Sequence, residues 1–258
     1  MKGVKCRCFV VKKEAKLSLQ IEPQIKIEGR SHILFDAATV SKPTVDLFSV
    51  ESLRRQGVVE ETAGGRGSSF IIRSQNGAWV LRHYRRGGLV GKVLNDQYLG
   101  FSSEGSRSWR EWRLLHKLYK EGMPVPRPVA AAVHRSTGFY QADLITELLP
   151  ETKTVAEWLS QKPLDREDWL AMGRLIARFH AKGVFHADLN AHNILMNEDR
   201  LFYLIDFDRG EIRHEGGWMQ ANLNRLHRSF MKLLGQCDYF CFEERDWQYL
   251  HEGYTDMF

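Results

Sequence analysis

The sequence predicts an α+β chain of two lobes: an N-terminal lobe built on an antiparallel β-sheet with one main helix, and a mostly helical C-terminal lobe. Three observations predict this division. Short strands and turns fill most of residues 25–149, helical patterns dominate residues 150–258, and Pro150 marks the change between them. Since ligands often bind in the cleft between two lobes, we expect a binding site close to the join.

The composition is that of a globular protein with a basic balance. Of 258 residues, 43% are hydrophobic and 27% are charged, and the formal net charge is +5. An excess of Lys and Arg suits a phosphorylated ligand, an anionic membrane surface or nucleic acid, and does not choose among them. Nucleic-acid binding is disfavoured because the chain has no recognisable binding motif.

The cysteines do not predict a metal site. They form one C-x-C pair and one C-x3-C pair: Cys6, Cys8, Cys237 and Cys241. Neither pair has zinc-finger spacing, and free thiols are typical of a reducing cytoplasm. No apolar run approaches the roughly 20 residues that span a bilayer, and the apolar stretch near the amino terminus is too short for a signal peptide. Any membrane contact is therefore expected to be peripheral.

The N-terminal lobe follows residues 1–24. These residues are rich in lysine, and polar and apolar residues alternate weakly in the segment KLSLQIE. We interpret these residues as an extension or an added edge strand. The segments SSFIIR and AWVLRHY, joined by a QNG turn, then predict a β-hairpin. The small-residue segment TAGGRGSS precedes this hairpin.

A helix is predicted next, over residues 107–121. Trp112, Leu115 and Leu118 recur in it at helical spacing. Gly122 and the prolines that follow end the helix, because proline cannot continue it. The segments VAAAVH and FYQADLITELL then predict two further strands.

After Pro150 the pattern predicts two helices, TVAEWLSQ and DREDWLAMGRLIARFHAKG. The second carries an apolar stripe that we interpret as core: Trp169, Met172, Leu175, Ile176 and Phe179. A hairpin-like segment, ILMNEDRLFYLIDF, and a final helical region from Trp218 complete the lobe.

The segment FHADLNAHNIL, which precedes that hairpin, carries polar residues at an unusual spacing. His186 and Asp188 are followed by Asn193, and Asp206 ends the next apolar run. This pattern, H-x-D-x-x-x-x-N and then an Asp, resembles the catalytic loop and metal-binding segment of the protein-kinase-like superfamily. A polar turn that caps a helix would account for any one of these residues but not for the set.

The resemblance implies a role for each residue of this set. Phosphoryl transfer needs positioning and charge neutralisation, so one carboxylate must orient the acceptor hydroxyl and take its proton. The resemblance gives that role to Asp188, with His186 bracing the loop. Mg²⁺ prefers oxygen ligands, which Asn193 and Asp206 would supply. ATP and Mg²⁺ are the implied cofactors.

The resemblance also places nucleotide-binding residues in the first lobe. Glycines let backbone N–H groups approach phosphates, and Gly64, Gly65 and Gly67 lie where the superfamily has its glycine-rich loop. The third glycine of that loop is missing, and Phe70 stands near its place. Since glycines between two strands are common, this loop alone is weak support.

A cation and its acidic partner are expected beside that loop. Arg82, in the run WVLR, replaces the superfamily's strand lysine, and a guanidinium can bind phosphate through two parallel hydrogen bonds. Glu111 is the only acid in the first turns of the helix and is our choice of partner, although an exposed surface glutamate is an alternative. Backbone groups from Glu147 to Leu149 occupy the place of the adenine-binding hinge.

Two departures from protein kinases indicate the kind of acceptor. After DFDRGEIR there is no A-P-E element and no long segment before the next helix. Asn190 also stands where many protein kinases have a lysine. A peptide substrate is therefore disfavoured, and a small or lipid-linked acceptor is expected.

Four segments narrow the resemblance: LRHYRRGG, PVPRP, HADLNAHNIL and IDFDRG. Together they resemble the 3-deoxy-D-manno-octulosonic acid (Kdo) kinases, over about residues 25–232. That family implies transfer of a phosphoryl group from ATP to a hydroxyl of Kdo on a lipid A precursor, in lipopolysaccharide inner-core biosynthesis. It also implies a peripheral location on the cytoplasmic face of the bacterial inner membrane, with no protein partner.

An anionic acceptor favours arginine ligands, since Kdo has a carboxylate and its lipid carrier has phosphates. Arginines on either side of the predicted helix 107–121 are the candidates: Arg85, Arg86, Arg107 and Arg110. A solvated basic surface would explain them equally well.

The helix from Trp218 has two stripes. One is apolar (Leu223, Leu226, Phe230 and Leu233), and the other is basic (Arg225, Arg228 and Lys232). A basic amphipathic helix can lie on an anionic membrane, although an apolar stripe more often packs on its own lobe.

Two other functions stay open. A soluble small-molecule kinase resembling the aminoglycoside phosphotransferases would share the loop motif, but such polycationic substrates favour acidic pockets. A non-catalytic module with the same fold would be expected to lack Asp188, Asn193 or Asp206, and all three are present.

Overall fold

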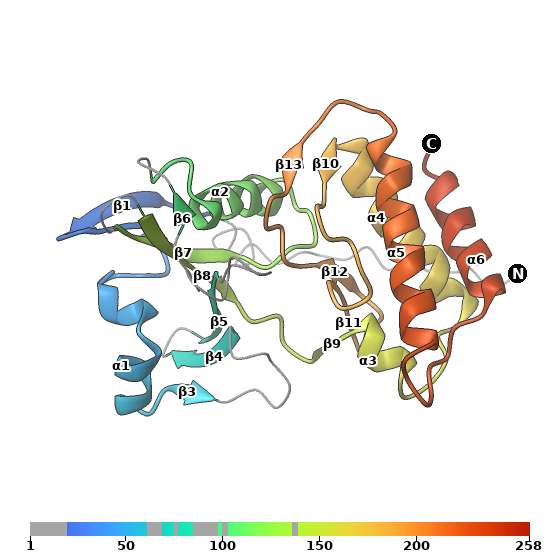
Figure 1. Cartoon of the computed structure of the whole chain (residues 1–258), viewed down its shortest axis with the longest axis horizontal. Helices are drawn as coiled ribbons and strands as arrows, with labels where there is room; N and C mark the ends of the chain where they lie inside the picture. Colours follow the sequence, from blue (N-terminus) through green and yellow to red (C-terminus); the bar gives the residue numbers. More distant parts are fainter. Residues whose placement is uncertain (1–19, 61–68, 75–76, 85–97, 100–102, 136–138) are drawn as a thin grey trace, which may run out of the picture.

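The computed structural model describes residues 20–60, 69–74, 77–84, 98–99, 103–135 and 139–258. It has a strand-rich lobe and a helix-rich lobe side by side, as the sequence predicts (Figure 1). The hairpin, the helix at residue 107, the two strands after it and the helices after Pro150 all form, within a few residues of the expected bounds. The QNG turn overlaps residues 75–76, which lie outside the described part of the chain.

The N-terminal lobe holds an antiparallel sheet in the order β1-β2-β7-β8-β5-β4-β3, with β6 paired to β8. Its strands are β1 (Pro23–Glu28), β2 (Ser31–Asp36), β3 (Val59–Glu60), β4 (Ser69–Ser74), β5 (Gly77–His83), β6 (Tyr98–Leu99), β7 (Pro128–Arg135) and β8 (Phe139–Glu147). Its helices are η2 (Val45–Phe48), α1 (Val50–Arg55) and α2 (Arg107–Lys120). The short helices η2 and α1 were not predicted, because so few residues give no clear helical period.

Both faces of the sheet are covered by other parts of the chain. Because side chains alternate along each strand, neighbouring residues belong to different hydrophobic cores. In β2, Leu34 belongs to the larger core, with α2 and the second lobe, while Ile33 and Phe35 belong to a smaller core with Leu53 of α1. Successive side chains of a strand point to opposite faces, which accounts for this division. Trp112 of α2 is fully buried in the larger core, so one core ties α2 to both lobes.

The C-terminal lobe is mostly helical. Its helices are α3 (Val155–Leu159), α4 (Arg166–Ala181), α5 (Trp218–Leu234) and α6 (Glu244–Thr255). Its short strands are β9 (Thr152–Thr154), β10 (Val184–Phe185), β11 (Ile194–Asn197), β12 (Phe202–Leu204) and β13 (Glu211–Ile212). The predicted core stripe of α4 is buried, and Leu223, Leu226 and Phe230 of α5 are buried as well. No helix in the described ranges is long and apolar enough to cross a membrane.

The final helical region expected from Trp218 forms as two helices, since α6 follows α5 and packs against α4 (Figure 1). Two glycines permit this packing. A Cβ added to Gly173 of α4 would lie 2.0 Å from the Leu250 carbonyl oxygen, and one added to Gly253 would lie 2.2 Å from that of Leu170. Since no side chain fits in such gaps, the close approach of the two helices depends on glycine at both positions.

His180 of α4 makes the stability of this lobe depend on pH. Its buried ring lies between Trp218 and Tyr254, with Nδ1 at 2.9 Å from the Tyr254 hydroxyl. Burial lowers the pKa of His180 to about 4, whereas the same ring in the unfolded chain titrates near 6.5. The unfolded state therefore binds a proton at a pH where the folded state does not.

We expect the free energy of unfolding to fall as the pH drops from about 6.5 to about 4, by up to about 3 kcal/mol from this residue. Urea unfolding at a series of pH values measures the slope. The His180→Gln variant cannot titrate there, so its slope should be shallower than that of the unaltered chain, whatever its stability at pH 7. Equal slopes in the two proteins would contradict the assignment.

Candidate active site

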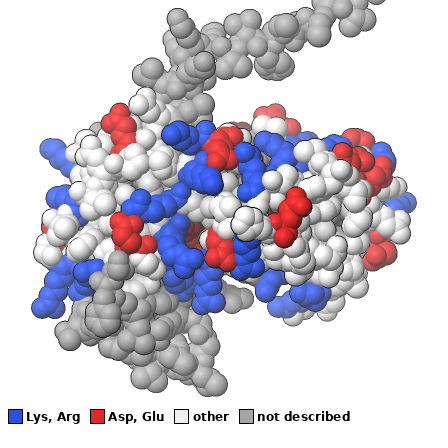
Figure 2. Space-filling view, turned by 90° about the horizontal axis from the view of Figure 1, so that it is seen from above, with Lys and Arg blue, Asp and Glu red and all other residues white. Residues whose placement is uncertain are grey.

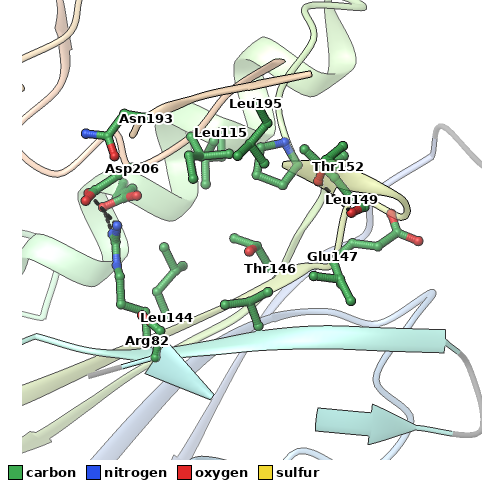
Figure 3. Close-up of a pocket in the computed structure, with 16 residues that line it drawn as sticks. Arg82, Leu115, Leu144, Thr146, Glu147, Leu149, Thr152, Asn193, Leu195 and Asp206 are labelled. Atoms are coloured by element: carbon green, nitrogen blue, oxygen red, sulfur yellow. Dashed lines mark hydrogen bonds and ion pairs between the residues drawn. The ribbon is translucent and has the colours of Figure 1, made fainter. Parts of the chain in front are cut away.

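A cavity of about 280 Å³ lies between the lobes (Figure 3). Its apolar walls come from β5, α2, β8 and β11, and include Val80, Leu115, Leu144 and Leu195. The segment from Glu147 to Leu149 lines one end, and the Leu149 N–H has no hydrogen bond within the described residues. An apolar slot with a backbone donor at its end suits a flat heterocycle such as adenine.

The opposite end of this cavity is charged. Arg82 reaches across it from β5, and Figure 3 shows its guanidinium pointing at Asp206. Val80 and Arg82 both line the cavity, as expected for two residues on one strand face. Nη1 of Arg82 donates to Asp206, and Nη2 donates to Glu111 of α2. The predicted strand–helix ion pair between Arg82 and Glu111 is therefore present.

Glu111 is almost fully buried, with every oxygen hydrogen-bonded. One carboxylate oxygen accepts from the Phe207 N–H at 3.0 Å, and the other accepts from Arg82 and from the Tyr84 hydroxyl. Burial raises the pKa of Glu111, while the adjacent guanidinium opposes that effect. The three-way contact joins β5, α2 and the segment after β12, so it sets the position of Asp206 relative to the first lobe.

Tyr84 is a member of this cluster that the sequence analysis missed. Its hydroxyl accepts from Arg82 Nη2 at 2.7 Å and donates to Glu111. Its ring lies 4.7 Å from the Arg82 guanidinium carbon and 5.2 Å from that of Arg107. Burial raises the pKa of Tyr84, so the hydroxyl keeps its proton and can donate. Tyr84 lies two residues after Arg82 on the same strand face, which was the available signal.

The loop between β10 and β11 is held from inside the second lobe. His186 is buried, with Nε2 at 2.9 Å from the Ile205 carbonyl oxygen and Nδ1 accepting from the Asp188 N–H at 3.2 Å. Burial lowers the pKa of His186 and keeps the ring neutral, which matches one donor and one acceptor nitrogen. His186 therefore contacts both the loop and the segment before Asp206 through its two ring nitrogens.

Helix α5 holds the same loop from the other side. Asn222 accepts from the His186 N–H at 3.3 Å and donates to its carbonyl oxygen at 3.0 Å. About two turns further along α5, the Ser229 hydroxyl accepts from the Ala191 N–H at 3.1 Å. The sequence analysis missed both contacts, because they join segments about 40 residues apart in the chain.

A second, polar cavity of about 680 Å³ opens on the α5 side of this loop. Asp188 and Arg225 line only this cavity, and Arg225 Nη1 donates to Asp188 Oδ1 at 2.9 Å. Asn193 and Asp206 line both cavities. The two side chains therefore stand where a molecule in the first cavity would meet a molecule in the second.

Asn193 and Asp206 offer oxygen donors at this junction. The Asn193 Nδ2 donates to the Asp188 carbonyl oxygen at 2.9 Å, which turns the amide oxygen toward Asp206 (Figure 3). Asp206 has a φ of 62°, in the left-handed region that Asp tolerates better than most residues. In the described part of the chain, no group of three or more His, Cys, Asp or Glu side chains could hold a metal. An amide oxygen and a carboxylate oxygen suit Mg²⁺ rather than zinc.

Several predicted site residues lie elsewhere or are not described. Gly64, Gly65 and Gly67, with Arg85 and Arg86, lie outside the described residues, so their roles stay predictions. Arg107 donates two hydrogen bonds to the Asp208 carboxylate, and Arg110 lies 3.9 Å from Glu211. Neither arginine lines the two cavities.

Basic side chains gather near the middle of the face seen from above, around a hollow between the two lobes, with acidic side chains among them (Figure 2). Some arginines of the described residues are ion-paired, as Arg107 is with Asp208. On this face, basic side chains therefore surround the hollow where the lobes meet.

Comparison with known proteins agrees with this geometry. Residues 51–254 match the family model described as the lipopolysaccharide kinase (Kdo/WaaP) family. The chain belongs to this family. The match covers most of the chain, continues beyond residue 232 and includes nearly all of α6. The Kdo/WaaP assignment confirms the resemblance drawn from the four segments, and it confirms that the chain is a kinase.

Curated relatives share most of their length with this member of the Kdo/WaaP family. A 3-deoxy-D-manno-octulosonic acid kinase of Vibrio vulnificus (strain YJ016) is 38% identical over 89% of this chain and 97% of its own length. The protein of the same name from Actinobacillus succinogenes is 42% identical, over 81% and 90%. That from Mannheimia succiniciproducens is 37% identical, over 90% and 100%.

Proposed function

We propose that this chain transfers the γ-phosphoryl group of ATP to a hydroxyl of Kdo on a lipid A precursor, in lipopolysaccharide inner-core biosynthesis. One observation carries the proposal beyond the family: Asn193 and Asp206 line both cavities, while Asp188 lines only the polar one. A nucleotide in the first cavity and an acceptor in the second would meet at these residues. The names of the similar kinases support Kdo as the acceptor.

The proposed reaction assigns a task to each side chain. The acceptor hydroxyl oxygen forms a bond to the γ-phosphorus, the bond from that phosphorus to the β–γ bridging oxygen breaks, and ADP leaves. Asp188 orients the hydroxyl and takes its proton. Arg82, fixed by Glu111 and Tyr84, binds phosphate oxygens, and Leu149 N–H binds the adenine edge.

Mg²⁺ is part of the proposal. Asn193 and Asp206 would hold it, and when bound it would neutralise charge on the phosphate oxygens. Arg82 donates a hydrogen bond to Asp206, and the guanidinium has further N–H groups that can bind nucleotide phosphates.

The lobes divide this work in the proposal. Residues 25–149 bind the nucleotide phosphates, residues 150–258 carry the catalytic loop with the metal and acceptor sites, and residues 1–24 are an extension. We also propose that the protein acts at the cytoplasmic face of the inner membrane as a peripheral protein. Each well-placed Lys or Arg would contribute about 1 kcal/mol of attraction to anionic head groups, and salt would weaken it.

A transfer assay with labelled ATP tests the substrate. The purified chain is offered a Kdo-bearing lipid A precursor, an aminoglycoside and a basic protein, with and without Mg²⁺. We expect label on the Kdo lipid alone, and only with Mg²⁺. Label on the aminoglycoside or the protein, and none on the Kdo lipid, would overturn the substrate. ATP binding with no transfer to any acceptor would favour a non-catalytic module.

A further inference from the structure

The polar cavity beside Asp188 has one wall made by a single helix. Five of its lining residues come from the loop between β10 and β11 and from Asp206, and the other six come from α5 and the residues just after it. From α5 and its C-terminal end come Arg225, Arg228, Ser229, Lys232, Leu233 and Gln236. The wall opposite the catalytic carboxylate is therefore rich in cations.

The spacing of these cations places them on one helical face. Arg225, Arg228 and Lys232 follow one another at three and four residues, so their side chains are neighbours. The same helix is hydrogen-bonded to the catalytic loop through Asn222 and Ser229. Because these two anchors bracket Arg225 and Arg228, the cations hold a defined place relative to Asp188.

The three cations differ in what they contact. Arg225 contacts Asp188, so it has an anionic partner within the protein. Arg228 and Lys232 are exposed to solvent, and neither has an acidic partner among the residues that the structure describes. Like charges at this spacing on a helix repel one another. A cavity that keeps two such cations beside a catalytic carboxylate is suited to an anion.

We propose that Arg228 and Lys232 bind the carboxylate of the acceptor sugar acid, and so hold its reacting hydroxyl next to Asp188. The inference rests on the proposed function, because an octulosonic acid carries one carboxylate close to its hydroxyls. A guanidinium binds a carboxylate through two parallel hydrogen bonds, and an ammonium adds a third donor group. The basic stripe of α5 is thereby assigned to the acceptor instead of to the membrane.

The test measures transfer to the Kdo-bearing lipid A precursor by variants that lose the charge but keep a polar side chain. Arg228→Gln and Lys232→Gln should each raise the acceptor KM about 10-fold or more, because each loses a charge-assisted hydrogen bond. The KM for ATP should change less than twofold. Arg178→Gln, an exposed change on α4 away from both cavities, is the matched control and should leave the acceptor KM unaltered.

Two altered acceptors identify the group that the cations bind. When the Kdo carboxyl is converted to its methyl ester, the acceptor KM of the unaltered enzyme should rise to the value that the two variants show with the free acid. The acceptor KM of the variants should be the same for the ester and for the free acid. With the lipid phosphates removed, the difference between the enzyme and its variants should persist. If removing the phosphates abolishes that difference, the cations bind lipid phosphate and the proposal is overturned.

The outcomes also separate this inference from the proposed function. If the unaltered chain does not phosphorylate the Kdo lipid, the proposed function fails. If it does so, and both variants keep its acceptor KM, only the assignment of Arg228 and Lys232 fails.

Discussion

Asp188→Asn should lower turnover about 10²- to 10⁴-fold and leave the affinity for ATP near that of the unaltered enzyme. The change removes the only carboxylate of the catalytic loop, and an amide cannot take the proton of the acceptor hydroxyl. Asp188 lines the polar cavity and not the one between the lobes, so nucleotide binding should persist.

The loop itself should survive this substitution. Its shape depends on backbone contacts of Asp188, whose N–H donates to His186 and whose carbonyl oxygen accepts from Asn193. Among the described residues, the Asp188 carboxylate is hydrogen-bonded to Arg225 alone, at an exposed position. Steady-state transfer to the Kdo lipid, with ATP binding measured separately by calorimetry, checks both halves of the prediction. Near-normal turnover in the folded variant would remove Asp188 from the mechanism.

Asp206→Asn should impair nucleotide binding itself. The carboxylate stands at the junction of the two cavities, and its loss removes one of two expected ligands of Mg²⁺ together with their only negative charge. We expect turnover to fall by at least 10²-fold and Mg²⁺ to tighten ATP binding far less than it does in the unaltered enzyme. Arg82 keeps Glu111 and Tyr84 as partners, so the first lobe should hold its shape.

A nearby acid provides the control for this variant. Asp208→Asn also removes a carboxylate from the same segment, but Asp208 is paired with Arg107 and lines neither cavity. Titrations of ATP with and without Mg²⁺ should show an unaltered metal dependence in Asp208→Asn. The same metal dependence in Asp206→Asn and in the unaltered enzyme would contradict a metal site at Asp206.

The polar loop of residues 186–193 was predictable because its information is local. His186, Asp188 and Asn193 lie within eight residues, and a loop of that length has few ways to present three polar side chains. The pairing of Arg82 with Glu111 was harder to predict, since 29 residues separate them. Each residue was nevertheless predictable from the strand or helix that carries it. A strand face and the first turns of a helix are both periodic features of the sequence.

The residues that sequence reasoning missed act through contacts between distant segments. Tyr84, Asn222 and Ser229 look like an ordinary aromatic and two ordinary polar residues in their own elements. Their importance comes from Glu111, His186 and Ala191, which approach them only in the folded chain. The basic stripe of α5 was visible in the sequence, but its nearness to Asp188 was not.

By itself, the sequence determined the two-lobe class, the strands β4, β5, β7 and β8, the helices α2 to α5, and the polar set that identifies a kinase. These features depend on periodicity and on short spacings, which local backbone geometry converts directly into structure. Only the tertiary structure decided that Asn193 and Asp206 line two cavities, that Tyr84 completes the Arg82 cluster, and that α5 lines the polar cavity beside Asp188. Those arrangements depend on how helices and strands pack, and packing is set by contacts between residues far apart in the chain.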